Sequence, residues 1–123
     1  MKDPAVKIEV QGAICITLAK SAPGDPRVED QVFACADDKR DTIRANAVEA
    51  LGYIGSKRAM ARLYDSLKNE KNTRVRGAAA TGLGWAHQKD AVPALQDAAA
   101  NDKSMTVKEA AMKALKELGA AAR

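Results

Sequence analysis

The chain contains the segment IRANAVEALG at residues 43–52, and this segment decides the fold because it recurs. It returns as VRGAAATGLG at residues 75–84 and as VKEAAMKALK at residues 107–116, without a gap in either step. The starts at 43, 75 and 107 give a period of 32 residues. A fixed period in this range is typical of stacked supersecondary units, each too small to bury its apolar face alone.

Each unit is expected to be a pair of antiparallel helices. In residues 39–54, apolar side chains recur at i, i+4, i+7, i+8 and i+11 counted from Ile43, which places them on one helical face. Gly55 suits the left-handed position that ends a helix, and Ser56 is a good N-cap for the next one. The second helix of this unit is expected to end at about Lys68.

The following units repeat this pattern. Asn72 or Thr73 is expected to cap the first helix of the third unit, and Asp90 to cap its second helix, with Pro93 in the first turn. The fourth unit has one helix, over residues 105–118, and is either a terminal cap or the start of a longer array. The predicted fold is one all-α domain, a right-handed α-α superhelix of about 3.5 units and about seven helices. The expected units span residues 4–37, 38–69, 70–101 and 102–119.

The first unit matches the pattern less well. Aligning Leu18 with Leu51 requires an offset of 33, which predicts that Ile14 is buried and that Ile8 and Ile16 lie on an outer face. Such an apolar outer face predicts contact with a partner, a missing domain or a second copy of the chain.

Residues 6–18 of this unit allow two structures. Apolar residues alternate there around Gln11-Gly12, as in a β-hairpin. Helix is the preferred prediction, because a solenoid buries its first unit against a matching neighbour. Asp3-Pro4 and Asp25-Pro26 are typical starts for the two helices of this unit.

The composition restricts the classes of function. Apolar residues make up 46% of the chain but aromatic residues only 3%, so alanine and leucine must build the core. Aromatic-lined ligand pockets and base-stacking platforms are therefore not expected. The net charge of +4 is a mild excess that favours solubility more than nucleic-acid binding. The sequence shows no signal peptide and no apolar run of about 18 residues, so a cytoplasmic location and no membrane contact are expected.

The two cysteines, Cys15 and Cys35, are not spaced as metal ligands. Buried free thiols are the preferred interpretation, because free cysteine is among the most buried residue types. The alternative is a disulfide that joins the two helices of the first unit, which would require an oxidising compartment.

The aligned units share an acidic residue, then Val or Ile five positions later, a basic residue directly after it, and Leu-Gly in two of the three units. This pattern resembles HEAT repeats, and most closely the short, alanine-rich form found in phycobilin lyase subunits. The resemblance implies a hydrogen-bonded ladder between adjacent repeats, in which each basic side chain reaches an acid of the next unit. A structural ladder is preferred over a phosphate-binding stripe. Its residues are Asp38, Arg44, Glu70, Arg76, Asp102 and Lys108.

A partner-binding surface is predicted on the solvent-facing side of the second helices. Its charges are mixed, which favours a protein partner over a phosphate backbone; the alternative is an ordinary solvated helix face. Trp85 aligns with Tyr53 and is expected to pack between repeats, or else to anchor a partner. The candidate binding residues are Arg58, Arg62, Asp65, Trp85, Gln96 and Asp97.

No motif for chemistry stands out. His87 is the only histidine, and no adjacent Cys or Ser completes a triad or metal site. The predicted function is a non-catalytic scaffold that binds another protein or a missing domain, without a cofactor. Two alternatives remain, a helper subunit of a bilin lyase-like enzyme that presents a chromophore or acceptor protein, and a nucleic-acid-binding HEAT module.

Overall fold

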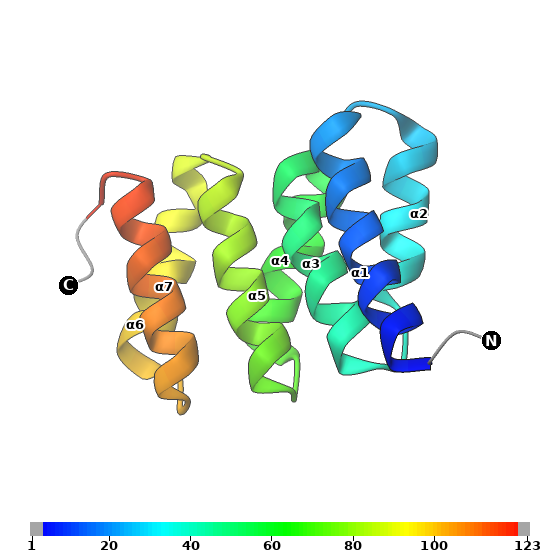
Figure 1. The fold of residues 1–123 in the computed structure, drawn as a ribbon. Coiled ribbons are helices and arrows are strands. Elements are labelled where there is room, and N and C mark those ends of the chain that lie inside the picture. Colours follow the sequence, from blue (N-terminus) through cyan, green and yellow to red (C-terminus); the bar gives the residue numbers. More distant parts are fainter. Residues whose placement is uncertain (1–3, 121–123) are drawn as a thin grey trace.

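The computed structural model describes residues 4–120, with side chains from residue 13 onward, and in this part of the chain helices joined by short loops are the only regular secondary structure (Figure 1). The predicted all-α solenoid is confirmed, and residues 6–18 form helix rather than a hairpin. No helix in the described residues is long and apolar enough to cross a membrane. The elements are α1 (Pro4–Ser21), α2 (Pro26–Ala36), α3 (Asp41–Ile54), α4 (Lys57–Asn69), α5 (Thr73–Trp85), η1 (Lys89–Ala91, a 3-10 turn), α6 (Val92–Asn101) and α7 (Met105–Glu117).

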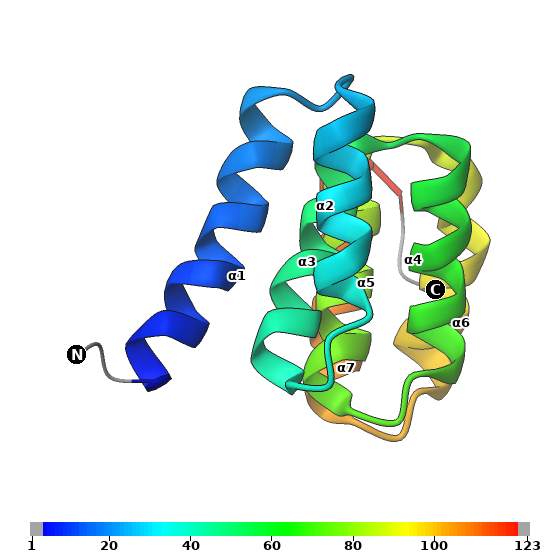
Figure 2. The ribbon, with the colours of Figure 1, turned by 90° about the vertical axis from the view of Figure 1, so that its right-hand side faces the viewer.

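The helices form two layers (Figure 2). Helices α1, α3, α5 and α7 make up the A layer, and α2, α4 and α6 make up the B layer. Neighbouring A-layer helices pack closely on one another along the whole stack, whereas α4 and α6 in the B layer touch only slightly. The B layer is therefore the more open side of the solenoid.

Local sequence signals set several helix boundaries. Ser56 Oγ accepts a hydrogen bond from the Ala59 backbone N–H at 3.1 Å, and Asn72 Oδ1 accepts from the amides of Arg74 and Val75. Gly55 ends α3 in the left-handed region, with φ of 64°. These caps were predicted, and they satisfy backbone groups that a helix terminus leaves without an intrahelical partner.

The predicted N-cap at Asp90 is wrong. Asp90 lies within η1, and α6 begins after Ala91 without a side-chain cap. The 3-10 turn itself supplies the first hydrogen bond, from the Ala91 amide to the Gln88 carbonyl at 3.1 Å. The Gln88 side chain also donates to the Gly55 carbonyl at 2.9 Å, which fixes this turn against the preceding unit.

Glycines allow the close packing of the A layer. A Cβ atom added at Gly52 would meet the Gly82 backbone, with the Gly82 Cα at 2.7 Å. One at Gly84 would lie 3.0 Å from the Ala114 Cβ. The backbones of α3 and α5, and to a lesser degree α5 and α7, therefore approach more closely than larger residues would permit.

The predicted register of α1 is wrong by one residue. Ile14 is 49% exposed, whereas Cys15 and Ala19 are buried. An offset of 32 matches Cys15 to Ala47 and Ala19 to Leu51, so the first unit keeps the period of the rest. The reason is that the contact surface of this helix is built from small side chains, and an alignment guided by the large ones misses it.

The same shift changes the expected outer face of the first unit. Ile16 is partly buried against the core rather than facing outward, and the side chain of Ile8 lies outside the described residues. Ile14 is the large apolar side chain that α1 exposes within residues 13–21.

Cys15 and Cys35 are buried free thiols that join α1 to α2. Burial, and then the hydrogen bond between the two thiols, raises the pKa of Cys15 to about 12. Because the thiolate is the reactive form, we expect both thiols to react with an aromatic disulfide reagent at neutral pH at least about 100-fold more slowly than in urea. Absorbance of the released thiolate measures the rate. Equal rates in buffer and in urea would show that α1 separates readily from α2.

Candidate protein-binding surfaces

Two arginines connect neighbouring units at one end of the helices. Arg44 donates from Nη2 to Glu70 of the next unit at 2.8 Å, and from Nη1 to the carbonyl of Asp38 at 3.1 Å. Arg76 repeats the arrangement, with Nε and Nη2 donating to Asp102 at 3.0 and 3.2 Å and Nη1 to the Glu70 carbonyl at 2.9 Å. Each guanidinium thus holds backbone of its own unit and a carboxylate of the next. This geometry supports the proposal that these residues are structural.

The links differ in detail. Glu70 receives one hydrogen bond from Arg44, whereas Asp102 receives two from Arg76. Burial is the largest single effect on Asp102 and opposes its ionisation. The hydrogen bonds from Arg76 and the Ser104 amide, with the charges of Arg76 and Lys108, together outweigh burial and lower the pKa of Asp102. At the N-terminal end Asp38 pairs with Arg40 of its own unit, at 2.8 Å, and at the other end Lys108 contributes its positive charge to Asp102.

The two candidate arginines of α4 contact the preceding unit. Arg58 donates to Asp30 at 3.0 Å, and its guanidinium carbon lies 3.8 Å from the centre of the Phe33 ring. Arg62 donates to the carbonyl of Ala36 at 2.8 Å and to Asp37 at 2.7 Å. Both side chains therefore bridge α4 to α2, a use that charge patterning alone did not predict.

The other candidates divide between the two layers. Asp65 and Asp97 are exposed on α4 and α6, and each accepts a hydrogen bond from an asparagine one turn later. Gln96 is half-buried on α6. Trp85 lies in the A layer, so the structure does not bring the six candidate residues onto one surface.

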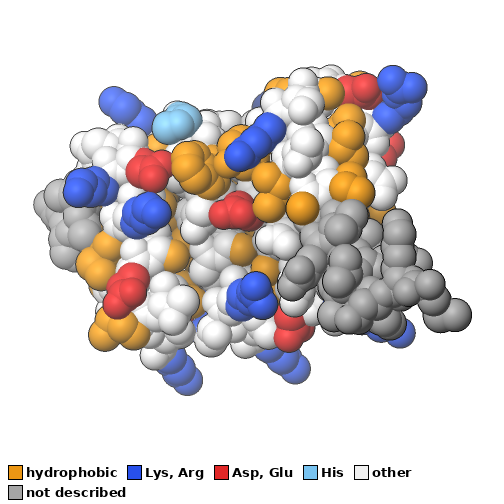
Figure 3. Space-filling model, in the orientation of Figure 1, with side chains coloured by type: hydrophobic (Ala, Val, Ile, Leu, Met, Phe, Trp, Pro, Cys, Tyr) orange, Lys and Arg blue, Asp and Glu red, His pale blue; other side chains and the backbone are white. Residues whose placement is uncertain are grey.

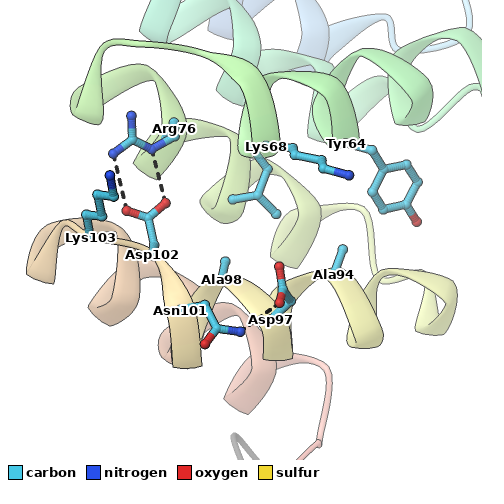
Figure 4. A pocket seen from close by; sticks show the side chains of 10 residues that line it. Tyr64, Lys68, Arg76, Ala94, Asp97, Ala98, Asn101, Asp102 and Lys103 are labelled. Carbon is cyan, nitrogen blue, oxygen red and sulfur yellow. Dashed lines mark hydrogen bonds and ion pairs between the residues drawn. The ribbon is translucent and has the colours of Figure 1, made fainter.

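A groove opens in the B layer between α4 and α6, with a volume of about 520 Å³ (Figure 4). Leu67, Ala94 and Ala98 supply apolar lining, and the Tyr64 ring lies near one end. The groove exists because α4 and α6 touch only slightly while the A-layer helices above them are closely packed.

Charges of both signs surround this groove. Lys68 of α4 and Lys103 of the loop after α6 are exposed, and Asp97 faces the same space. The Arg76–Asp102 pair lies at the other end from Tyr64 (Figure 4). A groove of this kind, with an apolar lining and mixed charges, fits a protein segment better than a uniform phosphate backbone. Among its residues the sequence prediction included only Asp97 as a binding residue.

The six candidate binding residues did not include Tyr64, Lys68 and Lys103, which the structure brings to one groove. Lys68 was expected on the solvent-facing side of its helix, but without Tyr64 and Lys103 beside it. Tyr64 and Lys68 are four residues apart and so share a helix face, a signal that was available. Lys103 follows the ladder residue Asp102 in a loop, and only the relative placement of α4 and α6 shows that it lines the same groove as Lys68.

An aromatic pair crosses the A layer. Tyr53 of α3 and Trp85 of α5 stack with ring centroids 5.7 Å apart, and Lys20 of α1 lies 5.1 Å from the centre of the Tyr53 ring. Trp85 is 36% exposed and its indole N–H donates to Glu49. Figure 3 shows other exposed hydrophobic side chains on this face, with charged ones between them. Trp85 thus packs between repeats and keeps an accessible edge.

Glu49 makes stability pH-dependent. Burial raises its pKa above the ordinary value of 4.5, against the opposing effects of Trp85, Lys20 and Lys113. Its charged form is therefore disfavoured in the folded state, and stability falls as pH rises from about 4.5 through the raised pKa. We expect Glu49→Gln, which can still accept from Trp85, to be more stable than wild type at pH 7 and equal to it at about pH 4. Thermal unfolding of both proteins at both pH values measures this. A stability difference between variant and wild type that is the same at pH 7 and at about pH 4 would contradict the prediction.

His87 occupies a turn rather than a reaction centre. It is exposed and has a positive φ of 54°, at the position that Gly55 fills in the preceding unit. Within the described residues no group of three His, Cys, Asp or Glu side chains could hold a metal ion.

The family assignment rests on the repeats themselves. The family model for HEAT repeats matches residues 3–84 and again residues 61–123. The chain belongs to the HEAT-repeat family. No curated protein matches this HEAT-repeat chain in a direct comparison of sequences.

A solved structure gives a more specific likeness. The HEAT-repeat chain is similar to a chain in the complex of CpcE and CpcF of phycocyanin lyase from Nostoc sp. PCC7120, with 25% sequence identity and a TM-score of 0.66. The match covers 97% of this chain and 50% of that chain. The chain therefore spans about half the length of the lyase chain that it resembles, and the predicted likeness to phycobilin lyase repeats is confirmed.

Proposed function

We propose that this HEAT-repeat chain is a non-catalytic scaffold that binds a segment of a partner protein in the groove between α4 and α6. The observation that supports this most directly is the groove itself, with its apolar lining and charges of both signs. An extended or helical segment can place apolar side chains against Leu67 and Ala98, and its own charges opposite Lys68 and Asp97.

The bridging arginines support the same proposal. Arg58 and Arg62 tie α4 to α2, and Arg76 ties the α5–α6 unit to Asp102 at the end of the groove. These contacts hold the groove in a defined shape before a partner arrives, so less conformational entropy is lost on binding.

The test is capture of partners from a source lysate with the purified chain. One bait is wild type, one carries Lys68→Glu with Asp97→Lys in the groove, and a control carries Lys113→Glu in the A layer. All three positions are exposed, so the fold is preserved. A stoichiometric protein that binds wild type and the control but not the groove variant supports the proposal. A protein lost only with the A-layer change would place binding on the A layer.

A helper role in bilin attachment is the second candidate. It is favoured by the likeness to a lyase-complex chain over 97% of this chain. Addition of a bilin to the purified chain tests it, because a bound chromophore gives a shifted visible absorbance band. A shift that survives gel filtration would favour this role over a protein scaffold alone.

Nucleic-acid binding is the third candidate. The mixed charge of the groove argues against it, since duplex DNA requires a more uniformly basic surface. If the chain bound random duplex DNA at about 50 mM salt and lost this binding at about 200 mM, the result would favour the nucleic-acid role.

A further inference from the structure

The outward side of α7 differs in kind from the same side of the other A-layer helices. In the internal steps this side meets the next helix of the stack and is lined by small or apolar residues. For α3 facing α5 these are Ala45, Val48 and Gly52. The matching positions of α5 are Gly77, Ala80 and Gly84; Gly84 lies against Ala114 of α7, whereas a Cβ added at Gly77 would meet nothing within 4 Å. All six are buried.

A step of 32 residues gives the matching positions of α7, which are Glu109, Met112 and Lys116. Met105 and Lys108 lie on the same side, since their counterparts Asp41 and Arg44 also reach the following unit. We call this surface the α7 face. It consists of Met105, Lys108, Glu109, Met112 and Lys116.

The α7 face is apolar at two points and charged between them. Met105 is 63% exposed and Met112 is 41% exposed, and Figure 3 shows hydrophobic side chains over the lower half of α7. Lys108 and Glu109 form no salt bridge within the described residues, although Lys108 is half-buried and its charge also acts on Asp102. Lys116 stands where Gly52 and Gly84 permit close backbone approach, so a helix cannot pack here as α5 packs on α3.

The order of these residues is self-complementary. A two-fold axis that passes between Lys108 and Glu109 pairs α7 with an antiparallel copy of itself. Position 105 of one copy then faces position 112 of the other, and position 108 faces position 109. Each methionine meets a methionine, and each lysine meets a glutamate. Methionine is flexible enough to fill the space that the flanking lysines leave.

We propose that the α7 face binds a second copy of this chain, with the two α7 helices antiparallel across a two-fold axis. This surface is separate from the groove between α4 and α6, so the two proposals can fail independently. A contact limited to one helix from each copy is small, below about 1,200 Å², and belongs to the weak class of interfaces. We therefore expect a dissociation constant of roughly 10 μM to 1 mM.

The experiment is sedimentation velocity from about 10 μM to 1 mM protein, at low salt, with charge-reversed variants. Glu109→Lys puts two lysines from each copy at the centre, and Lys108→Glu puts two glutamates there. Each variant alone should be monomeric, with dimerisation weakened at least tenfold. An equimolar mixture should associate again, because every lysine then faces a glutamate of the other variant.

Two further variants make the result specific. Met112→Glu places a charge at the apolar contact and should give a monomer, whereas Lys113→Glu, on the neighbouring outer side of α7, should leave dimerisation unchanged. Circular dichroism confirms that each variant is folded. A wild type that stays monomeric at about 1 mM overturns the proposal. So does a dimer that is insensitive to Met112→Glu, or a pair of reversed variants that fail to associate.

Discussion

Gly52→Ala should lower the free energy of unfolding by about 3 kcal/mol or more, the largest effect expected for a single methyl group in this chain. The added Cβ would fall against the backbone of Gly82, with the Cα at 2.7 Å, and no side-chain rotation can relieve a clash between two backbones. Helices α3 and α5 would have to separate, which loosens the closest contact of the A layer. Urea denaturation followed by circular dichroism measures the loss.

Gly77→Ala is the matched control for this prediction. Gly77 lies in α5, the helix against which Gly52 of α3 packs, but a Cβ at Gly77 would meet nothing within 4 Å. Alanine should therefore act only through helix propensity and raise the free energy of unfolding by about 0.5–1 kcal/mol. If Gly52→Ala left the free energy of unfolding unchanged or raised it, α3 and α5 would not approach each other as closely as the structure shows.

Leu83→Ala should cost about 2–5 kcal/mol, because it removes a fully buried side chain from α5 and leaves a cavity among closely packed helices. Leu83→Met keeps most of the volume and should cost less than about 1.5 kcal/mol. Both are measured by the same urea titration. A loss for Leu83→Ala below about 0.5 kcal/mol, the size of a surface effect, would mean that the repeat register is wrong.

Much of the fold could be predicted because it depends on periodic patterns and on capping residues that are local in the sequence. The period of 32 residues placed Ile43, Val75 and Val107 at matching buried positions, and all three are fully buried. Caps at Ser56 and Asn72 depend only on neighbouring residues, so their positions could be predicted as well. The misplaced cap at Asp90 shows the boundary of such reasoning, since η1 is held partly by Gln88 reaching Gly55 in another unit.

The candidate site was harder to predict because it depends on distances between helices. The sequence showed charged residues at Arg58 and Arg62 but not that acids and carbonyls of α2 lie within reach. The groove exists only because glycines bring the A layer together while α4 and α6 stay apart. The register of α1 failed for a related reason, since Cys15 and Ala19 make the contact that larger residues were expected to make.

The unequal packing of the two layers has a mechanical consequence. Backbone contacts such as Gly52 against Gly82 leave the A layer almost no room to shorten, so this layer resists compression along the stack. The B layer has slack between α4 and α6, and bending of the solenoid must therefore be taken up there. A change in the curvature of the solenoid therefore changes the width of the groove between α4 and α6. We therefore expect a ligand that binds between α4 and α6 to change the curvature of the solenoid. Conversely, tension applied to the two ends of the solenoid should change the affinity for that ligand.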